Sequence, residues 1–236
     1  MQRADLLNAG VAARRKHTVA SLVAVMNKAA TQDLRVVRVL PQIDRVLRTG
    51  PAPSARDERI LSLLEAWRAK GASRLDRDLD GKIDDPGAAI MDAAWPRMAD
   101  AVMRPILGPL VGQLAALMPR DDAPNPGGSS YLTGWYGYVE KDLRGFFDPN
   151  ATTGHGRFAT RFCGAGDLGR CRADLWAALD AAGNELEAAQ GPDAAAWRAD
   201  ATAERIRFSG FLPATMRWAN RPTFQQVVSF ATHRRR

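Results

Sequence analysis

The pattern of apolar and polar positions along the chain predicts a protein built mainly from helices, with a few short strands. Between residues 4 and 30, apolar side chains recur at helical spacing on one face, while Arg14-Arg15-Lys16 fall on the solvent side. A second apolar run continues past Pro41 to a break at Gly50-Pro51. The pattern therefore predicts two consecutive helices in the first fifty residues.

Three more helical segments follow the same logic. A helix capped by Ser54 or Asp57 carries an apolar stripe, and another begins at Pro86-Gly87, where Pro96 and Pro105 are expected to kink or divide it. The most regular segment spans 172–190, with apolar residues spaced four, three, four and three apart. Gly191-Pro192 then stops it. The stripes are Ile60, Leu61, Leu64 and Trp67, then Ile90, Ala94, Met98 and Val102, then Leu175, Leu179, Ala182, Leu186 and Ala189.

A polar segment rich in Pro, Gly, Asn and Ser divides the chain. It covers residues 119–130 and predicts a linker between a helical region at 1–118 and a C-terminal region at 131–236. The stretch from Tyr131 to Phe147 is rich in aromatic residues. Stacking on a nucleic acid or a sugar is one interpretation, but burial in a core or a subunit contact is the commoner fate of such residues.

Charge is distributed unevenly over the 236 residues, whose net charge is +7. Residues 1–50 have nine basic and three acidic side chains, a net charge of +6. Residues 197–236 have eight basic and two acidic side chains, also +6, so residues 51–196 have a net charge of −5. The basic ends are expected to contact an acidic surface, either within the chain or on a partner. Nucleic acid is disfavoured as that partner because the arginines are dispersed. We predict no membrane span, and the N-terminal residues lack the character of an export signal.

The chain has two cysteines, Cys163 and Cys171, on either side of a glycine-rich turn. Thiols this close in sequence predict a small disulfide loop. A pair of free buried thiols, or half of a zinc site, are the alternatives. The intervening Gly164–Gly169 spells G-x-G-x-x-G, but no apolar strand precedes it, so a dinucleotide site is not expected.

The segment from Asp76 to Gly87 has the spacing of a calcium-binding loop. Aspartates alternate before Gly81, whose flexible backbone permits the sharp turn that such loops need. At the twelfth position Gly87 replaces the expected glutamate, for which Asp85 could substitute. An acidic turn held by Arg74 and Arg77 is the alternative. The predicted Ca²⁺ ligands are the side chains of Asp76, Asp78, Asp80 and Asp84 and the backbone carbonyl of Lys82.

No recognisable catalytic motif accompanies this loop. The sequence contains no nucleophile elbow, zinc-binding helix or phosphate loop, and its histidines pair with no serine or cysteine in a recognisable pattern. We therefore assign no catalytic residue and no organic cofactor from the sequence.

Several segments, in chain order, carry a family resemblance. They are Met26–Arg35, Leu63–Trp67, Asp76–Gly81, Asp84–Ala93, Gly134–Val139, Arg161–Gly164 and Arg217–Val228. Together they span most of the chain and resemble the penicillin acylase (penicillin amidase) family of N-terminal-nucleophile hydrolases. The similarity is to the C-terminal part of that family's β chain, and none of these segments is a catalytic motif.

The resemblance implies a function that this chain completes only with a partner. Members of the family are exported proenzymes that cleave themselves to expose a serine whose α-amino group acts as base. They hydrolyse linear N-acyl amides such as penicillins or acyl-homoserine lactones in a four-layer αββα fold. The nucleophile and the oxyanion donors belong to earlier parts of the family's chain, so we expect the chain starting at Met1-Gln2 to lack amidase activity alone.

The resemblance also implies partners and a location. The partner would be the remaining N-terminal part, namely the α chain and the start of the β chain. A periplasmic or secreted location is expected if the export signal lies upstream. The rival hypothesis is a stand-alone calcium-binding helical interaction module without catalysis.

Overall fold

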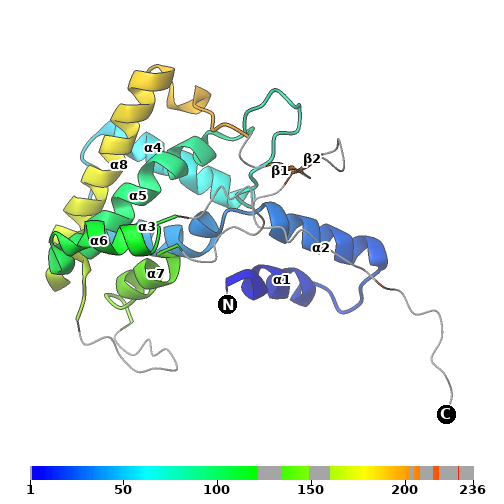
Figure 1. Ribbon diagram of the computed structural model, residues 1–236, viewed down its shortest axis with the longest axis horizontal. Helices are drawn as coiled ribbons and strands as arrows, with labels where there is room; N and C mark the ends of the chain where they lie inside the picture. Colours follow the sequence, from blue (N-terminus) through cyan, green and yellow to red (C-terminus); the bar gives the residue numbers. More distant parts are fainter. Residues whose placement is uncertain are drawn as a thin grey trace, which may run out of the picture.

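The computed structural model describes residues 2–121, 134–148 and 160–201, two short strands and Val228. These parts contain eight α-helices and a two-stranded antiparallel sheet, which confirms the mainly helical prediction (Figure 1). Strand β1 (Arg205–Arg207) pairs with β2 (Thr215–Arg217), and Ile206 lies opposite Met216.

The first predicted helix, over residues 4–30, is in fact two helices. Helix α1 (Gln2–Ala12) ends before a turn, and α2 (Val19–Thr31) then packs against α1. The break arises from a capping box. The backbone N–H of Ser21 donates to the Thr18 hydroxyl at 3.1 Å, and the Thr18 N–H donates to the Ser21 hydroxyl at 2.9 Å. The prediction of one long helix was wrong because the apolar pattern does not register this local stop.

The second run forms a π-helical turn at Arg35–Val39 that leads directly into α3 (Leu40–Leu47). Pro41 is tolerated because it occupies the first turn of α3, where a missing N–H costs no helical hydrogen bond. Helix α4 (Ala55–Ala69) begins at the predicted cap, since the Ser54 hydroxyl accepts from the backbone N–H of Asp57 at 3.1 Å.

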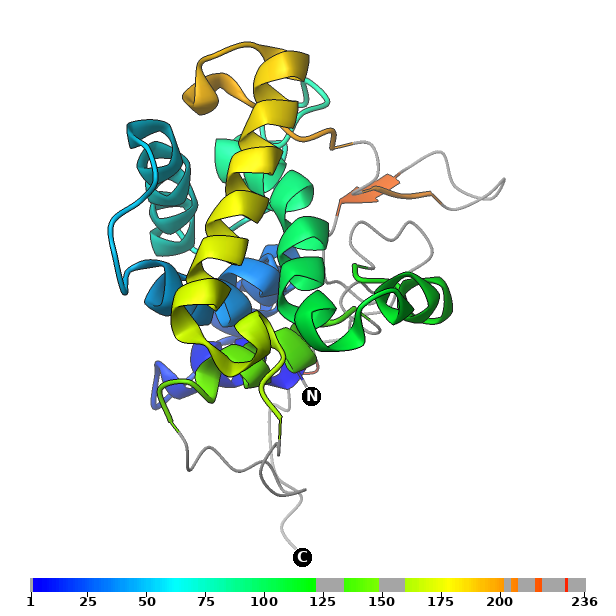
Figure 2. The same cartoon turned by 90° about the vertical axis from the view of Figure 1, so that its left-hand side faces the viewer.

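Helices α5 (Pro86–Leu107) and α8 (Leu168–Gln190) are the longest and pack side by side (Figure 2). Pro96 and Pro105 lie inside α5, which continues past both as one helix and is not divided. Helix α8 begins at Leu168, earlier than predicted, because the Asp167 carboxylate caps it by accepting from the Arg170 N–H at 2.7 Å.

Helices α6 (Leu110–Leu117) and α7 (Tyr136–Arg144) and two short 3₁₀ turns complete the described helical structure. The turns are Cys163–Gly166 and Ala194–Ala196. The core contains five buried tryptophans, Trp67, Trp95, Trp135, Trp176 and Trp197.

The aromatic segment contributes mainly to this core. Trp135 and Tyr136 are buried, and the Tyr136 ring lies 5.2 Å from that of Trp95, whereas Tyr138 is exposed. Tyr131 and most of the predicted linker at 119–130 lie outside the described residues, so the division of the chain at that linker stays a prediction.

Candidate functional site

The acidic segment connects α4 to α5, and its backbone pairs with residues 199–201. The Ile83 N–H donates to the Ala199 carbonyl at 2.9 Å, and the Ala201 N–H donates to the Gly81 carbonyl at 2.8 Å. Ile83 is fully buried, and Gly81 has a φ of +92°, a conformation that favours glycine. Pairing and burial therefore hold the middle of the loop in place.

Three of the predicted ligands come together in this loop. Carboxylate oxygens of Asp76, Asp78 and Asp84 all lie within 4.8 Å of one another. Asp76 is buried, Asp78 is exposed and Asp84 is half-buried. Such a set suits a hard cation. Because Ca²⁺ takes about six to eight oxygens, backbone carbonyls or water would have to complete the coordination.

The other acidic candidates make different contacts. The Asp80 carboxylate lies outside the group of three, and its Oδ1 accepts from the Lys82 N–H at 2.7 Å. Asp85 caps α5 by accepting from the Gly87 N–H at 3.0 Å, and its second oxygen lies 3.3 Å from Lys70 Nζ. Asp85 is thus engaged at the start of α5, while the complete ligand set stays a prediction.

Arg77 binds one of these three carboxylates, that of Asp84. Its backbone N–H donates to Asp84 Oδ1 at 3.0 Å, and its guanidinium forms an ion pair with Asp84 Oδ2. This contact matches part of the alternative interpretation, in which arginines hold the acidic turn. A cation bound by Asp84 would compete with this ion pair.

Packing explains the glycine at the twelfth loop position. A Cβ atom added to Gly87 would lie 2.6 Å from Trp67 Cε3 and 2.7 Å from Trp67 Cβ, closer than real Cβ contacts. Trp67 is itself buried, so it has little room to move. The first turn of α5 therefore excludes the glutamate that a standard calcium loop has at this place.

A buried ion cluster lies close to the loop in sequence, and pattern reasoning missed it. The Arg35 guanidinium contacts Asp33, Asp92 and Asp121 with N···O distances of 2.5, 2.6 and 2.5 Å. Arg74 reaches Asp33 at 3.0 Å and Asp92 at 2.8 Å. Arg74, which directly precedes Leu75 and the loop, therefore binds this cluster.

The cluster joins parts of the chain that are far apart in sequence. Asp33 and Arg35 lie between α2 and α3, Asp92 lies in α5, and Asp121 follows α6. The Tyr136 hydroxyl at the start of α7 donates to Asp121 Oδ1 at 2.5 Å. The only sequence signal was that most of these residues fall in the segments carrying the family resemblance.

The arginines keep the central carboxylates charged. Burial on its own raises the pKa of Asp33 and Asp92, but the positive charges of Arg35 and Arg74 outweigh it. The pKa of each carboxyl therefore lies below its ordinary value of 3.8. At neutral pH the cluster is ionised and braces the helices it joins.

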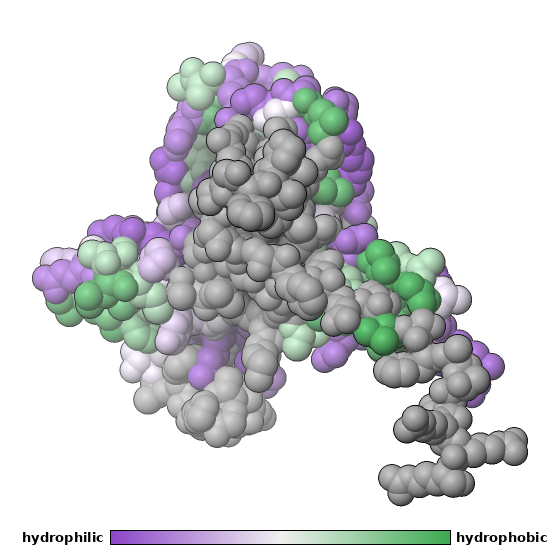
Figure 3. Space-filling view, turned by 45° about the vertical axis from the view of Figure 1, so that its right-hand side comes forward, coloured by the Kyte–Doolittle hydropathy of each residue, from purple (hydrophilic) through white to green (hydrophobic). Residues whose placement is uncertain are grey.

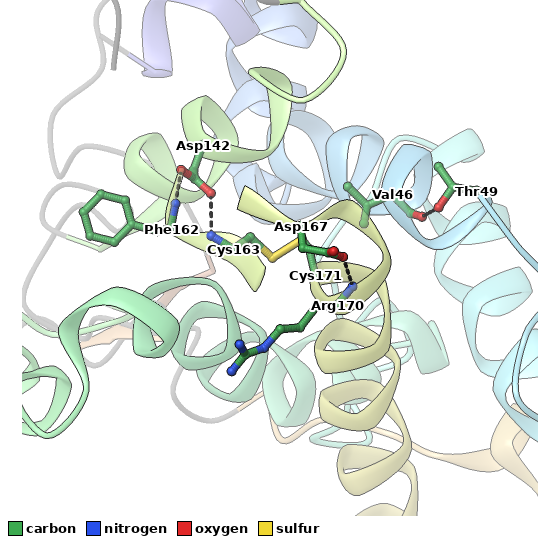
Figure 4. Close-up of a disulfide and its surroundings, with 8 residues drawn as sticks. All are labelled: Val46, Thr49, Asp142, Phe162, Cys163, Asp167, Arg170 and Cys171. Carbon is green, nitrogen blue, oxygen red and sulfur yellow. Dashed lines mark hydrogen bonds between the residues drawn. A yellow bond between two sulfur atoms is a disulfide. The ribbon is translucent and has the colours of Figure 1, made fainter. Parts of the chain in front are cut away.

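The predicted disulfide is present between Cys163 and Cys171, both fully buried (Figure 4). It ties the turn before α8 to the first turn of that helix, so neither cysteine is a free thiol or a zinc ligand. Asp142 of α7 accepts from the N–H groups of Phe162 and Cys163 at 2.8 and 2.9 Å. Burial raises the pKa of the Asp142 carboxyl, although these hydrogen bonds oppose the rise.

The described residues contain no recognisable catalytic pair. His17, the histidine among them, bonds the Val11 carbonyl at 2.9 Å and the Ser21 hydroxyl at 3.2 Å. Gly164–Gly169 forms the turn at the disulfide and the start of α8, which is not the setting of a dinucleotide loop. Among the described helices, none has the length and apolar character needed to cross a membrane.

Comparison with known proteins found a family and a related fold. The family model described as penicillin amidase matches residues 1–226. A solved structure, thermostable penicillin G acylase from Alcaligenes faecalis, matches with a TM-score of 0.60 and 19% sequence identity. The match covers 94% of this chain but only 39% of that acylase chain. A comparison with curated proteins gave no match.

Proposed function

Because the chain belongs to the penicillin amidase family, we propose that it is the C-terminal segment of an acylase that hydrolyses linear N-acyl amides. The observation that carries the proposal is the coverage of the match, which includes nearly all of this chain and 39% of an acylase chain. In this proposal the chain completes the αββα fold and part of the wall of the substrate cleft. Penicillins and acyl-homoserine lactones are the substrate class of the complete enzyme.

The chemistry of the described residues favours a structural role over a catalytic one. N-acyl hydrolysis by this family's chemistry needs an N-terminal serine whose amine serves as base, together with oxyanion donors. The described part of the chain offers instead buried ion pairs, a disulfide and a capped helical core. The nucleophile would come from the N-terminal part of the acylase. The disulfide favours an oxidising compartment, such as the periplasm or the exterior of the cell.

The first prediction concerns activity. We expect the purified chain alone to give no hydrolysis of a chromogenic phenylacetyl or fatty-acyl amide above the buffer rate, because in this proposal the nucleophile belongs to the N-terminal part of the acylase. The measurement is the initial rate at micromolar protein, with boiled protein as the control. Hydrolysis that scales with the concentration of this chain alone would contradict the proposal.

We also propose that the loop at residues 76–87 binds Ca²⁺ as a structural brace. Support comes from the three carboxylates of Asp76, Asp78 and Asp84 within 4.8 Å and from the glycine conformation at Gly81. Bound Ca²⁺ would neutralise mutual repulsion of these carboxylates next to the start of α5. The same loop motivates the rival function, a stand-alone calcium-binding module. That rival predicts calcium-stabilised folding without any partner.

The second prediction tests the metal. Calorimetric titration of Ca²⁺ should give saturable heat with the wild-type chain and none with Asp78→Asn, because Asp78 belongs to the carboxylate group. Asp85→Asn is the matched control, since Asp85 caps α5 outside that group and asparagine also caps helices. Equal heats from wild type and Asp78→Asn, or none from wild type, would remove the site.

A further inference from the structure

Helix α6 presents an apolar face that the described part of the chain does not cover. Leu110 is 54% exposed and Leu117 is 86% exposed, and Ile106 at the end of α5 is 43% exposed. Leu110 and Leu117 lie seven residues apart, about two helical turns, so they share one side of the helix. Leu117 is the most exposed of the large hydrophobic residues described.

Other residues of α6 anchor the helix to the core. Val111 is fully buried, and Leu114 and Ala115 pack against the core. The helix contains no charged residue. It lies at the left of Figure 1, and Figure 3 shows hydrophobic residues on the surface at its left-hand edge. An uncharged helix with two exposed leucines has the composition of a buried contact.

The coverage of the acylase match indicates what occupies this face. The match covers 39% of the acylase chain, so most of that chain lies outside the part that this chain matches. That larger remainder must meet this segment across a surface, and the surface of one fold divided in two resembles a core cut in half. The α6 face has that apolar character.

We infer that the α6 face, defined as Ile106, Leu110 and Leu117, is a docking surface for the N-terminal remainder of the acylase. The inference rests on the proposed function. It adds the place of contact and the chemistry of the partner, which presents an apolar, uncharged surface to α6. The two leucines supply the central contacts, because they are the most exposed members of the face.

The test uses the full chain and, as the probe, the acylase polypeptide encoded immediately upstream of it, each produced separately. Leu110→Glu/Leu117→Glu should weaken binding to the upstream polypeptide at least about tenfold, because two charges would be buried in an apolar contact. Ala173→Glu/Ala188→Glu is the matched control. It adds the same charge at two exposed positions of α8, and we expect binding within about twofold of wild type. Thermal melting of each chain alone checks that the variants fold.

The outcomes separate this inference from the function it rests on. If the wild-type chain fails to bind the upstream polypeptide, the proposed function itself fails. If wild type and the leucine variant bind equally, the function stands and the α6 face is not the docking surface. Light scattering of the chain alone covers a further case. If the wild-type chain is a dimer, and if Leu110→Glu/Leu117→Glu is a monomer that still binds the upstream polypeptide as tightly, the α6 face is a contact between two copies of this chain. That result would overturn the inference.

Discussion

Arg35 is fully buried and yet carries a charge, and its three carboxylate partners are what make that possible. A lone charge in a protein interior is strongly unfavourable, whereas a charge with several hydrogen-bonded partners of opposite sign is tolerated. The arrangement therefore makes each residue of the cluster dependent on the others. It also places the connection between α2 and α3, the second turn of α5 and the start of α7 in one network.

Replacing the central cation should be far more damaging than replacing an exposed one. Arg35→Met removes one of the two arginine partners of buried Asp33 and the arginine that contacts Asp121, and it should lower the free energy of unfolding by about 3–5 kcal/mol. Arg104→Met is the matched control. The side chain of Arg104 is 60% exposed and pairs with Asp100 on the surface of α5, so the loss should stay within about 1 kcal/mol. Urea unfolding measures both, and losses of equal size would contradict the importance of the cluster.

The same cluster predicts that the fold is weakened by acid. The pKa values of Asp33 and Asp92 are lower in the folded chain than their ordinary value of 3.8. Their contribution to stability is therefore complete above that pH and is lost as the pH falls through the folded values. Urea midpoints should decline below about pH 4, and the decline should be smaller in Asp33→Asn. An unchanged midpoint between pH 5 and pH 3 would contradict this prediction.

At the scale of elements, the junction of α4, the acidic loop and α5 shows how packing overrides a motif. The loop follows a calcium-binding pattern through Asp84 and then departs from it where α5 begins. Asp85 is used as a helix cap, and Gly87 is required by the close approach of Trp67. The loop therefore meets the helix in a geometry that excludes the usual last ligand.

Substitution of Gly87 tests this packing argument. Gly87→Ala places a methyl group against buried Trp67 and should cost about 1–3 kcal/mol of stability, as overpacking does. Gly112→Ala in α6 is the matched control, because a Cβ atom there meets nothing within 4 Å. Alanine should stabilise that helix by up to about 1 kcal/mol. Equal melting temperatures for the two variants would contradict the prediction.

Sequence patterns predicted the helices whose signals are local. The stripe in α4 and its Ser54 cap are correct, and so are the disulfide and the mainly helical fold. Residues 4–30 were predicted to form one helix because the apolar spacing continues across the capping box at Thr18. The ion cluster was missed for a different reason. Arg35 meets Asp92 and Asp121, which lie 57 and 86 residues away, and nothing in local periodicity records such contacts.

Among the site residues, the sequence placed the loop but not its details. Spacing alone predicted that Asp76, Asp78, Asp80 and Asp84 converge, and the structure brings the carboxylates of Asp76, Asp78 and Asp84 together but not that of Asp80. It could not show that Asp80 turns to the Lys82 N–H, since that depends on the local backbone. Nor could it show that Arg77 pairs with Asp84, because either an arginine or a cation satisfies the same carboxylate.

For the whole molecule, the chain combines a well-packed helical core with an apolar helix face left exposed. The core is braced by the ion cluster, the disulfide and five buried tryptophans. The exposed leucines of α6 and the 39% coverage of the acylase chain are both explained if this segment works as one part of a larger amide hydrolase. In that account the segment supplies structure to a reaction whose nucleophile lies in the other part.

The most direct test of this account is a titration of amide hydrolysis. Increasing amounts of this chain are added to a fixed amount of the acylase polypeptide encoded upstream, and the initial rate on a chromogenic phenylacetyl or fatty-acyl amide is measured. We predict no hydrolysis by either polypeptide alone and a rate that rises until the two are equimolar. Hydrolysis by this chain alone, or an upstream polypeptide whose rate this chain leaves unchanged, would contradict the account.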